Sequence, residues 1–410
     1  MVATSAATRP RTRHFGIGEA EYARRLQSVR RRLDERGLDA IVLFYSPRIM
    51  YLSGFTHVST ERPMALVVAA REALGVLVPA LEQEHVRKSP VITHVKAYPE
   101  YPSGGTKHPM LHLADLLGEM DLRGRRIGVD RDGYADVNGY VGPTVSQVTG
   151  VAVSEAPDVV DGLRQVKSES ELDLIRESAV WGNLAHRLLQ DGMAVGRTEI
   201  ETTLMATAEA SRMMLKTLGR AYQSHGRGIR NVPVSASFIA GSNTALPHGL
   251  RSERGLMPGD AIITGASANV GGYHSELERT MVVGEPTPEF RRYFEHMLQI
   301  QDAALAAFRP GRTCAEVEAD VVRAFVELGV QQHQRHHTGH GIGVEGHEQP
   351  FVDLGDDTVV EPGMVFSVEP GVYVVGVAGF RHSDTIIITP DGCELVTFYP
   401  RDLDSLVVPV

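Results

Sequence analysis

The chain has 410 residues and a net charge of −10, with 41 Lys and Arg against 51 Asp and Glu. This acidic balance excludes a large basic surface, so we expect no nucleic-acid partner. Hydrophobic residues make up 42% of the chain, which allows a core of normal size, and no apolar run approaches the roughly 18 residues of a membrane span, so we expect no membrane segment.

The first third of the chain alternates helix and strand patterns. Residues 19–36 carry apolar side chains at helical spacing, and Gly37 ends that pattern. The strand patterns that follow lie at 38–45, 64–70, 74–78 and 126–130. This alternation predicts a mixed α/β domain over residues 15–162. The arm before it, residues 1–14, is rich in Arg but lacks the apolar segment of a signal peptide, and we expect it to be flexible.

A second domain is predicted over residues 163–410. Ser168 and Glu171 form a capping box at the start of a long helix that runs toward Gln190. A second helix is expected at 198–218, where we interpret Leu204, Met205, Ala208, Met213 and Met214 as a core-facing stripe. Strands are expected at 234–240, 261–270 and 277–283, helices at 288–308 and 314–328, and a strand-rich segment at 364–389.

Two cysteines, Cys314 and Cys393, make no disulfide framework. Their number is typical of a protein from a reducing compartment, so we expect a cytoplasmic location.

A pair of acids stands out in the second domain. Glu276 and Glu278 are two residues apart in a strand pattern, so their side chains point to the same face. Two carboxylates on one face repel each other unless a cation lies between them or they line an open site. The pair therefore indicates either a functional site or a solvent-facing strand.

Around this pair lies a set of motifs in a fixed order. The motifs occupy residues 259–260, 273–280, 339–343, 368–373 and 381–385. This frame resembles the pita-bread family of Xaa-Pro peptidases, methionine aminopeptidases and creatinase, and the resemblance extends over nearly the whole chain. It implies an α/β (α+β) protein of two domains, a creatinase-type N-terminal domain and a pita-bread catalytic domain.

The resemblance also implies where metal ligands would lie. A metallopeptidase of that family would carry Asp, Asp, His, Glu and Glu, and the matching residues here are Gly265, Glu276, His340, Glu369 and Ser383. Glycine offers no ligand, and a serine hydroxyl is a poor one. We therefore expect no metal cofactor, and we leave open a single divalent ion on Glu276, His340 and Glu369.

Other site residues follow from the same resemblance. His248 matches a histidine that the family places over the substrate, and His347 matches one near the scissile bond. Arg62 matches a creatinase arginine that reaches into the other subunit of a homodimer and binds the substrate carboxylate, a role suited to a planar guanidinium. We expect Arg62, Glu276, His347 and Tyr273 to bind substrate. His333, His336 and His337 are interpreted as a solvated loop.

The creatinase-like acid pair leads to our first hypothesis, a metal-independent hydrolase acting on a C–N bond of a small guanidino or amidino acid. His248 would be the general acid and base, and His340 is expected to be a further catalytic residue. Glu278 and Glu369 would hold the cationic group of the substrate.

Two alternatives stay open at this point. One is a divergent Xaa-Pro dipeptidase that uses a metal ion. The other is a binding protein without catalytic activity on a peptidase scaffold.

Overall fold

The computed structural model describes residues 15–71, 73–99, 107–134, 142–219, 222 and 232–410. The predicted N-terminal arm lies outside these residues. The chain divides into two compact units, one built on residues 17–164 and the other mainly on residues 165–225 and 232–410. The boundary predicted between residues 162 and 163 stays a prediction.

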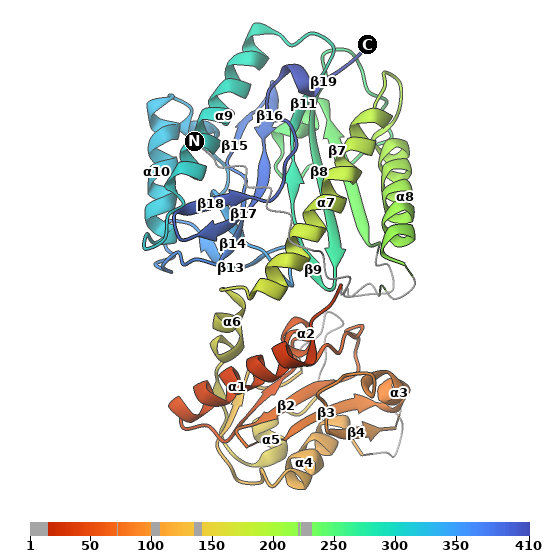
Figure 1. Cartoon of the computed structure of the whole chain (residues 1–410), viewed down its shortest axis with the longest axis vertical. Helices are drawn as coiled ribbons and strands as arrows, with labels where there is room; N and C mark the ends of the chain where they lie inside the picture. Colours follow the sequence, from red (N-terminus) through yellow and green to blue (C-terminus); the bar gives the residue numbers. More distant parts are fainter. Residues whose placement is uncertain (1–14, 72, 100–106, 135–141, 220–221, 223–231) are drawn as a thin grey trace. The chain divides into compact units, whose positions relative to one another are not determined.

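The N-terminal unit is a mixed sheet with helices, as the sequence pattern predicts (Figure 1). Its strand order is β4-β3-β2-β1-β5-β6, with β1 antiparallel to β2 and parallel to β5. The strands are β1 (Ala40–Leu43), β2 (Ala65–Ala69), β3 (Leu74–Pro79), β4 (His94–Tyr98), β5 (Ile127–Val129) and β6 (Ser154–Glu155). The helices are α1 (Glu19–Glu35), α2 (Ser46–Ser53), α3 (Gln83–Val86), α4 (Pro109–Glu119), α5 (Val145–Thr149) and α6 (Asp158–Arg164), with a 3-10 turn at Ala80–Glu82.

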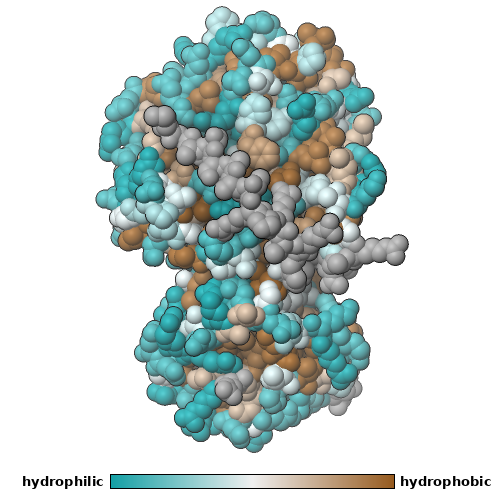
Figure 2. All heavy atoms as spheres, viewed as in Figure 1, coloured by the Kyte–Doolittle hydropathy of each residue, from teal (hydrophilic) through white to brown (hydrophobic). Residues whose placement is uncertain are grey.

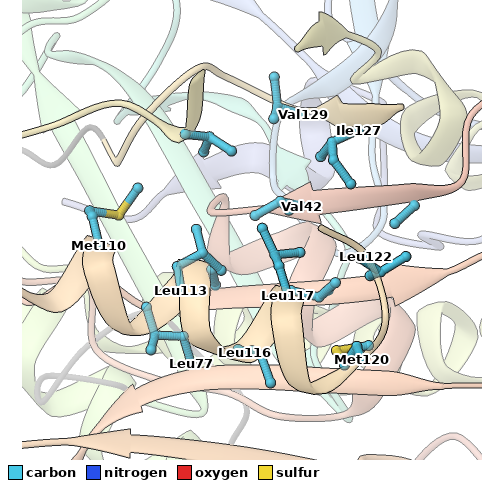
Figure 3. Packing of buried hydrophobic residues seen from close by; sticks show 14 of the residues in the cluster. Val42, Leu77, Met110, Leu113, Leu116, Leu117, Met120, Leu122, Ile127 and Val129 are labelled. Atoms are coloured by element: carbon cyan, nitrogen blue, oxygen red, sulfur yellow. The ribbon is translucent and has the colours of Figure 1, made fainter. Parts of the chain in front are cut away.

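The core of this unit lies between α4 and the sheet (Figure 3). Met110, Leu113 and Leu117 of α4 point toward Val42 and Ile127 on the central strands, and all five are buried. The spacing of three and four residues along α4 places these side chains on one face of the helix. Helix α4 thus covers one face of the sheet with its apolar side.

The C-terminal unit surrounds a larger sheet with helices. The helices are α7 (Glu169–Gly192), α8 (Glu199–Leu218), α9 (Pro288–Ala307) and α10 (Cys314–Glu327), with 3-10 turns at Gly241–Ala245, Gln331–His333 and Asp404–Leu406. The strands are β7 (Val234–Ala240), β8 (Ala261–Val270), β9 (Tyr273–His274), β10 (Leu277–Glu278), β11 (Thr280–Val283), β12 (Gly339–Gly341), β13 (Glu348–Val352), β14 (Val365–Val368), β15 (Gly371–Val374), β16 (Ala378–Arg381), β17 (Ser383–Thr389), β18 (Gly392–Leu395) and β19 (Val407–Val408). Helix α7 begins at the predicted capping box of Ser168 and Glu171.

The order of the central strands brings distant segments together. In the described residues the main path of the sheet runs β13-β12-β14-β17-β10-β8-β11-β19. The register pairs His340 with Ser367, Val368 with Asp384, and Glu278 with Ser383. The motifs that lie up to about a hundred residues apart in the chain therefore meet on four neighbouring strands, β12, β14, β17 and β10.

The stripe predicted on the second helix is wrong in part. Leu204 and Met205 are 63% and 56% exposed, whereas Met214 is fully buried. The face of α8 that packs on the unit consists of Thr202, Thr203, Ala206, Ala210, Met214 and Leu218. Small residues and threonines let α8 approach α7 and β7 closely, so Leu204 and Met205 lie on the exposed side although they are among its most hydrophobic side chains.

A buried ion pair joins the central strands of the C-terminal unit. Arg279 donates from Nη2 to Asp384 Oδ1 over 2.8 Å, and both side chains are 1% exposed. The same guanidinium donates to four backbone carbonyls, those of Glu278, Ser383, Tyr399 and Pro400. Arg279 therefore fixes β10 and β17 against the segment that follows β18.

The surface of the molecule is mostly hydrophilic on the face that Figure 2 shows. On the face shown in Figure 2, hydrophilic residues cover most of the outer edges of each unit, and hydrophobic residues form smaller groups among them. No helix in the part of the chain that the structure describes has both the length and the apolar content needed to cross a membrane. Both cysteines are free, Cys314 buried and Cys393 half-buried.

We predict that Arg279→Met lowers the free energy of unfolding by about 3–5 kcal/mol, because it leaves the Asp384 carboxylate buried without its counter-charge. Urea denaturation of the full chain measures this loss. The matched control is Arg291→Met, whose ion pair with Glu285 is exposed and should cost less than about 1 kcal/mol. Equal stability of the two variants would contradict the structural role given to Arg279.

A second prediction concerns His57 in the N-terminal unit. This imidazole is 3% exposed, and neither of its nitrogens has a hydrogen-bond partner among the described residues. Burial, with a smaller effect from His85, lowers the pKa of His57 to about 4. The imidazole of His57 therefore binds a proton less readily in the folded state than in the unfolded state. Protonation of His57 costs no stability above about pH 6.5, and the free energy of unfolding falls as the pH drops from there toward 4.

We expect the unfolding free energy to fall by about 2 kcal/mol between pH 7 and pH 5 from His57 alone. His57→Leu removes the titrating group, so its stability should depend less on pH by that amount. Urea denaturation at the two pH values tests this, and parallel pH curves for the variant and the wild-type chain would show that His57 does not contribute.

Candidate metal centre

Three carboxylates converge in the C-terminal unit. Glu276 immediately precedes β10, Glu278 lies in β10, and Glu369 follows β14. One oxygen from each lies within 4.8 Å of an oxygen from the other two. The two-residue spacing of Glu276 and Glu278 places both on one face, as the sequence predicts, and the pairing of strands adds Glu369 to them.

Position 265 faces this group without a side chain. Gly265 lies in β8, and a Cβ placed on it would be 3.5 Å from Glu278 Oε1. The carboxylate of Glu278 therefore lies next to the space that a side chain at position 265 would enter.

Two serines hold Glu276. The hydroxyls of Ser367 and Ser383 donate to Glu276 Oε1 over 2.6 and 2.8 Å, and the two hydroxyls lie 2.8 Å apart. The backbone N–H of Glu276 donates to Thr385 Oγ1. Ser383 thus orients an acid instead of adding a charge to the site.

Two stacked imidazoles complete this side of the group. The rings of His340 and His347 lie 3.7 Å apart with an angle of 19° between their planes. His340 is fully buried and His347 is exposed. His340, His347 and Glu276 each offer a ligand atom within 4.8 Å of the others.

The pKa of His340 reflects its acidic neighbours. Its Nε2 lies 3.3 Å from Glu369 Oε1 and has no hydrogen bond of good geometry among the described residues, so we treat this contact as electrostatic. Burial would lower the pKa of His340, but Glu369 and Glu276 outweigh it and raise that pKa to about 9. Burial also opposes ionisation of Glu369, yet His340 and Arg381 hold the pKa of Glu369 at about 2.

Arg381, at the end of β16, is the one guanidinium among the described residues that contacts these acids. Its Nη2 donates to Glu278 Oε1 over 2.7 Å, and its Nε contacts Glu278 Oε2. The Nε also lies 3.7 Å from Glu369 Oε2. Burial and the neighbouring acids raise the pKa of Glu278 to about 8, against the lowering effect of Arg381.

Arg381 is connected to a tyrosine and a histidine. Arg381 Nη1 donates to the Tyr373 hydroxyl over 3.1 Å, and that hydroxyl lies 2.9 Å from His336 Nε2. Because the hydroxyl accepts from the guanidinium, its own proton points to His336, whose Nδ1 then donates to the carbonyl of His337. His336 is therefore part of this network, and the solvated loop predicted around it is wrong at this residue.

The remaining predicted residues lie elsewhere. His248 is exposed in the turn after Gly241–Ala245, and its imidazole makes no hydrogen bond or ion pair within the described ranges. The Tyr273 hydroxyl donates to Glu171 of α7 over 2.9 Å. Arg62 belongs to the N-terminal unit and pairs with Glu61 over 2.5 Å. The catalytic and substrate-binding roles given to these three residues stay predictions.

Sequence reasoning missed Arg381, Tyr373, His336 and Ser367. Arg381 and Tyr373 lie inside motifs already recognised, and their place in those motifs was the available signal. Ser367 and His336 carry no such signal, because only the register of β12 and β14 and the fold of the loop bring them to the site.

These residues fit a divalent ion. Two imidazoles and a carboxylate are a donor set that zinc and similar ions bind, with room for a further ligand. His340 Nε2 is a buried nitrogen without a good hydrogen bond, which is the kind of atom that a ligand position requires. The ion would be held by Glu276, His340 and His347.

Comparisons with known proteins agree with this geometry. Residues 173–390 match "Metallopeptidase family M24", and residues 25–166 match "Creatinase/Prolidase N-terminal domain". The chain is 30% identical to "Probable dipeptidase PepE" of Mycobacterium tuberculosis, over 95% of this chain and 97% of that protein. It is 26% identical to "Xaa-Pro dipeptidase" of Pyrococcus horikoshii, over 90% of this chain and 96% of that protein.

Solved structures give the same result. The Xaa-Pro dipeptidase from Bacillus anthracis superposes with a TM-score of 0.79 at 25% identity, covering 94% of this chain and 99% of that one. The dipeptidase PepE from Mycobacterium ulcerans superposes with a TM-score of 0.78 at 27% identity, covering 96% and 100%. The predicted two-domain α/β architecture with a pita-bread domain is confirmed.

Two predictions are corrected here. The creatinase-like amidinohydrolase is wrong, because the relatives and structural neighbours above are dipeptidases. The expectation of no metal cofactor is also wrong, because the matching family is one of metallopeptidases and two groups of potential ligands converge in the site. The first error came from the creatinase-like pair of Glu276 and Glu278, and the second from the lack of acids at positions 265 and 383.

We predict that Tyr373→Phe lowers the free energy of unfolding by about 1–3 kcal/mol, because His336 Nε2 loses its partner in a mostly buried position. Urea denaturation measures the change. Tyr293→Phe is the matched control, since no hydrogen bond of the Tyr293 hydroxyl to a described residue is present, and it should stay within about 0.5 kcal/mol of the wild-type chain. A Tyr373→Phe variant as stable as this control would contradict the hydrogen-bond chain.

Proposed function

Because this chain belongs to metallopeptidase family M24, we propose that it is a metal-dependent dipeptidase that cleaves dipeptides with a C-terminal proline. The observation that carries the proposal is the convergence of Glu276, His340 and His347 around one point. The names of the relatives, dipeptidase and Xaa-Pro dipeptidase, support the substrate class.

Each residue of the site has a role in this proposal. Glu276, His340 and His347 would hold the ion, which when bound would polarise the peptide carbonyl as a Lewis acid. His347 takes the third position, which the sequence analysis gave to Glu369, because Glu369 already pairs with His340 and Arg381. Ser367 and Ser383 fix the orientation of Glu276 through its Oε1.

Glu369 and His347 differ in what they offer a substrate. Glu369 is buried and stays ionised, so it orients the His340 ring and keeps its charge beside the ion. His347 is the exposed member of the stacked pair, so its ring borders the side of the site that a dipeptide can reach. Burial and the neighbouring His340 lower the pKa of His347, which favours the neutral form that binds metal.

The test uses the full chain, stripped of metal with a chelator and then supplied with Mn²⁺, Co²⁺ or Zn²⁺. We expect release of proline from Ala-Pro and Leu-Pro with at least one of these ions, little release without ion, and no hydrolysis of creatine. Failure to cleave any dipeptide with any of the three ions would contradict the proposal.

Two variants test whether activity depends on the proposed ligands. His340→Ala removes a buried ligand and should lower kcat/KM for Ala-Pro by about 100-fold or more, since even residues outside the ligand shell can cost 10- to 100-fold. His333→Ala is the control, because the His333 ring packs against Tyr293 and belongs to neither group of potential ligands. Its kcat/KM should stay within about twofold of the wild-type value.

A further inference from the structure

We propose that the site binds one divalent ion and that the guanidinium of Arg381 takes the place of a second. This inference rests on the proposed function for the identity of the first ion's ligands. It concerns how many ions the site holds, which the family match leaves undecided for this chain.

The two groups of potential ligands are not equivalent. They share Glu276, but one adds His340 and His347, and the other adds Glu278 and Glu369. The second group already contains a cation, because Arg381 contacts both oxygens of Glu278 and lies 3.7 Å from Glu369 Oε2. An arginine keeps its charge at any ordinary pH, so this cation is permanent.

The charges of the site agree with a single ion. Counted as formal charges, the side chains of Glu276, Glu278 and Glu369 contribute −3 and that of Arg381 contributes +1, which leaves −2. One divalent ion brings this formal sum to zero, and an imidazole that binds an ion does so in its neutral form. A second ion would leave an excess of two positive charges in a site whose members are mostly buried, where uncompensated charge is costly.

The arrangement of acids explains why the cation is an arginine. Glu278 lies beside the empty side-chain position of Gly265, so β10 supplies a carboxylate next to the place where β8 has none. In the sheet, Glu278 is paired with Ser383, whose hydroxyl is neutral and donates to Glu276. With no acids at positions 265 and 383, the charge that would balance a second divalent ion is missing, and a single monovalent side chain is sufficient.

The first experiment counts ions in the wild-type chain. The full-length protein, freed of metal with a chelator, is titrated with Mn²⁺ in a calorimeter, and the bound ions are counted by electron paramagnetic resonance. We expect one Mn²⁺ per chain with the spectrum of an isolated ion. Two ions per chain, or a spectrum of two coupled ions, would overturn the inference, and so would no binding at all.

The second experiment changes the charge at position 381. Arg381→Lys keeps the positive charge and should still bind one Mn²⁺. Arg381→Glu changes the sum of charges from −2 to −4, and we expect it to bind two. An Arg381→Glu chain that folds, as judged by circular dichroism, but binds a single Mn²⁺ would overturn the role given to Arg381. Should that variant not fold, the count on the wild-type chain decides alone.

These readouts are separate from the dipeptidase assay. A chain that binds one ion but cleaves no dipeptide contradicts the proposed function and supports the ion count. A chain that cleaves Ala-Pro with two ions bound supports the proposed function and overturns the inference about Arg381.

Discussion

The contacts of Arg279 determine where the functional residues of the C-terminal unit lie. Its guanidinium pairs with Asp384 of β17 and binds four carbonyl groups, two of them at Glu278 and Ser383. Asp384 in turn accepts from Gln301 of α9 and Thr397. Because every donor and acceptor of this buried network has partners, the strands that carry the acids and the serines have one available register.

The site uses that register to place charges of opposite sign in contact. The acids come from β10 and from the segment after β14, the imidazoles from β12 and the loop before β13, and the guanidinium from β16. Three carboxylates at this distance would repel each other, so each is compensated by a different group: serine hydroxyls at Glu276, arginine at Glu278, and histidine at Glu369. The same polar contacts therefore hold these strands together and place the groups that we propose bind an ion.

The motifs read from the sequence gave the family and the fold correctly, and the first functional hypothesis incorrectly. The reason lies in how a substitution was interpreted. Gly265 and Ser383 were read as ligands lost from a list, but in three dimensions Glu278 lies beside Gly265 and Ser383 binds Glu276. A list of positions cannot show which side chains from neighbouring strands lie next to Gly265 and Ser383, since that depends on which strands pair.

The sequence by itself determined the helices and most strands, the face shared by Glu276 and Glu278, and the capping box of α7, because these follow from local periodicity and from contacts between residues a few positions apart. Only the tertiary structure decided which imidazoles stack, which acid Arg381 pairs with, and that His336 joins Tyr373 rather than solvent. Those contacts join residues up to about a hundred positions apart. Their energies depend on burial and on strand register, and a short stretch of sequence determines neither of these.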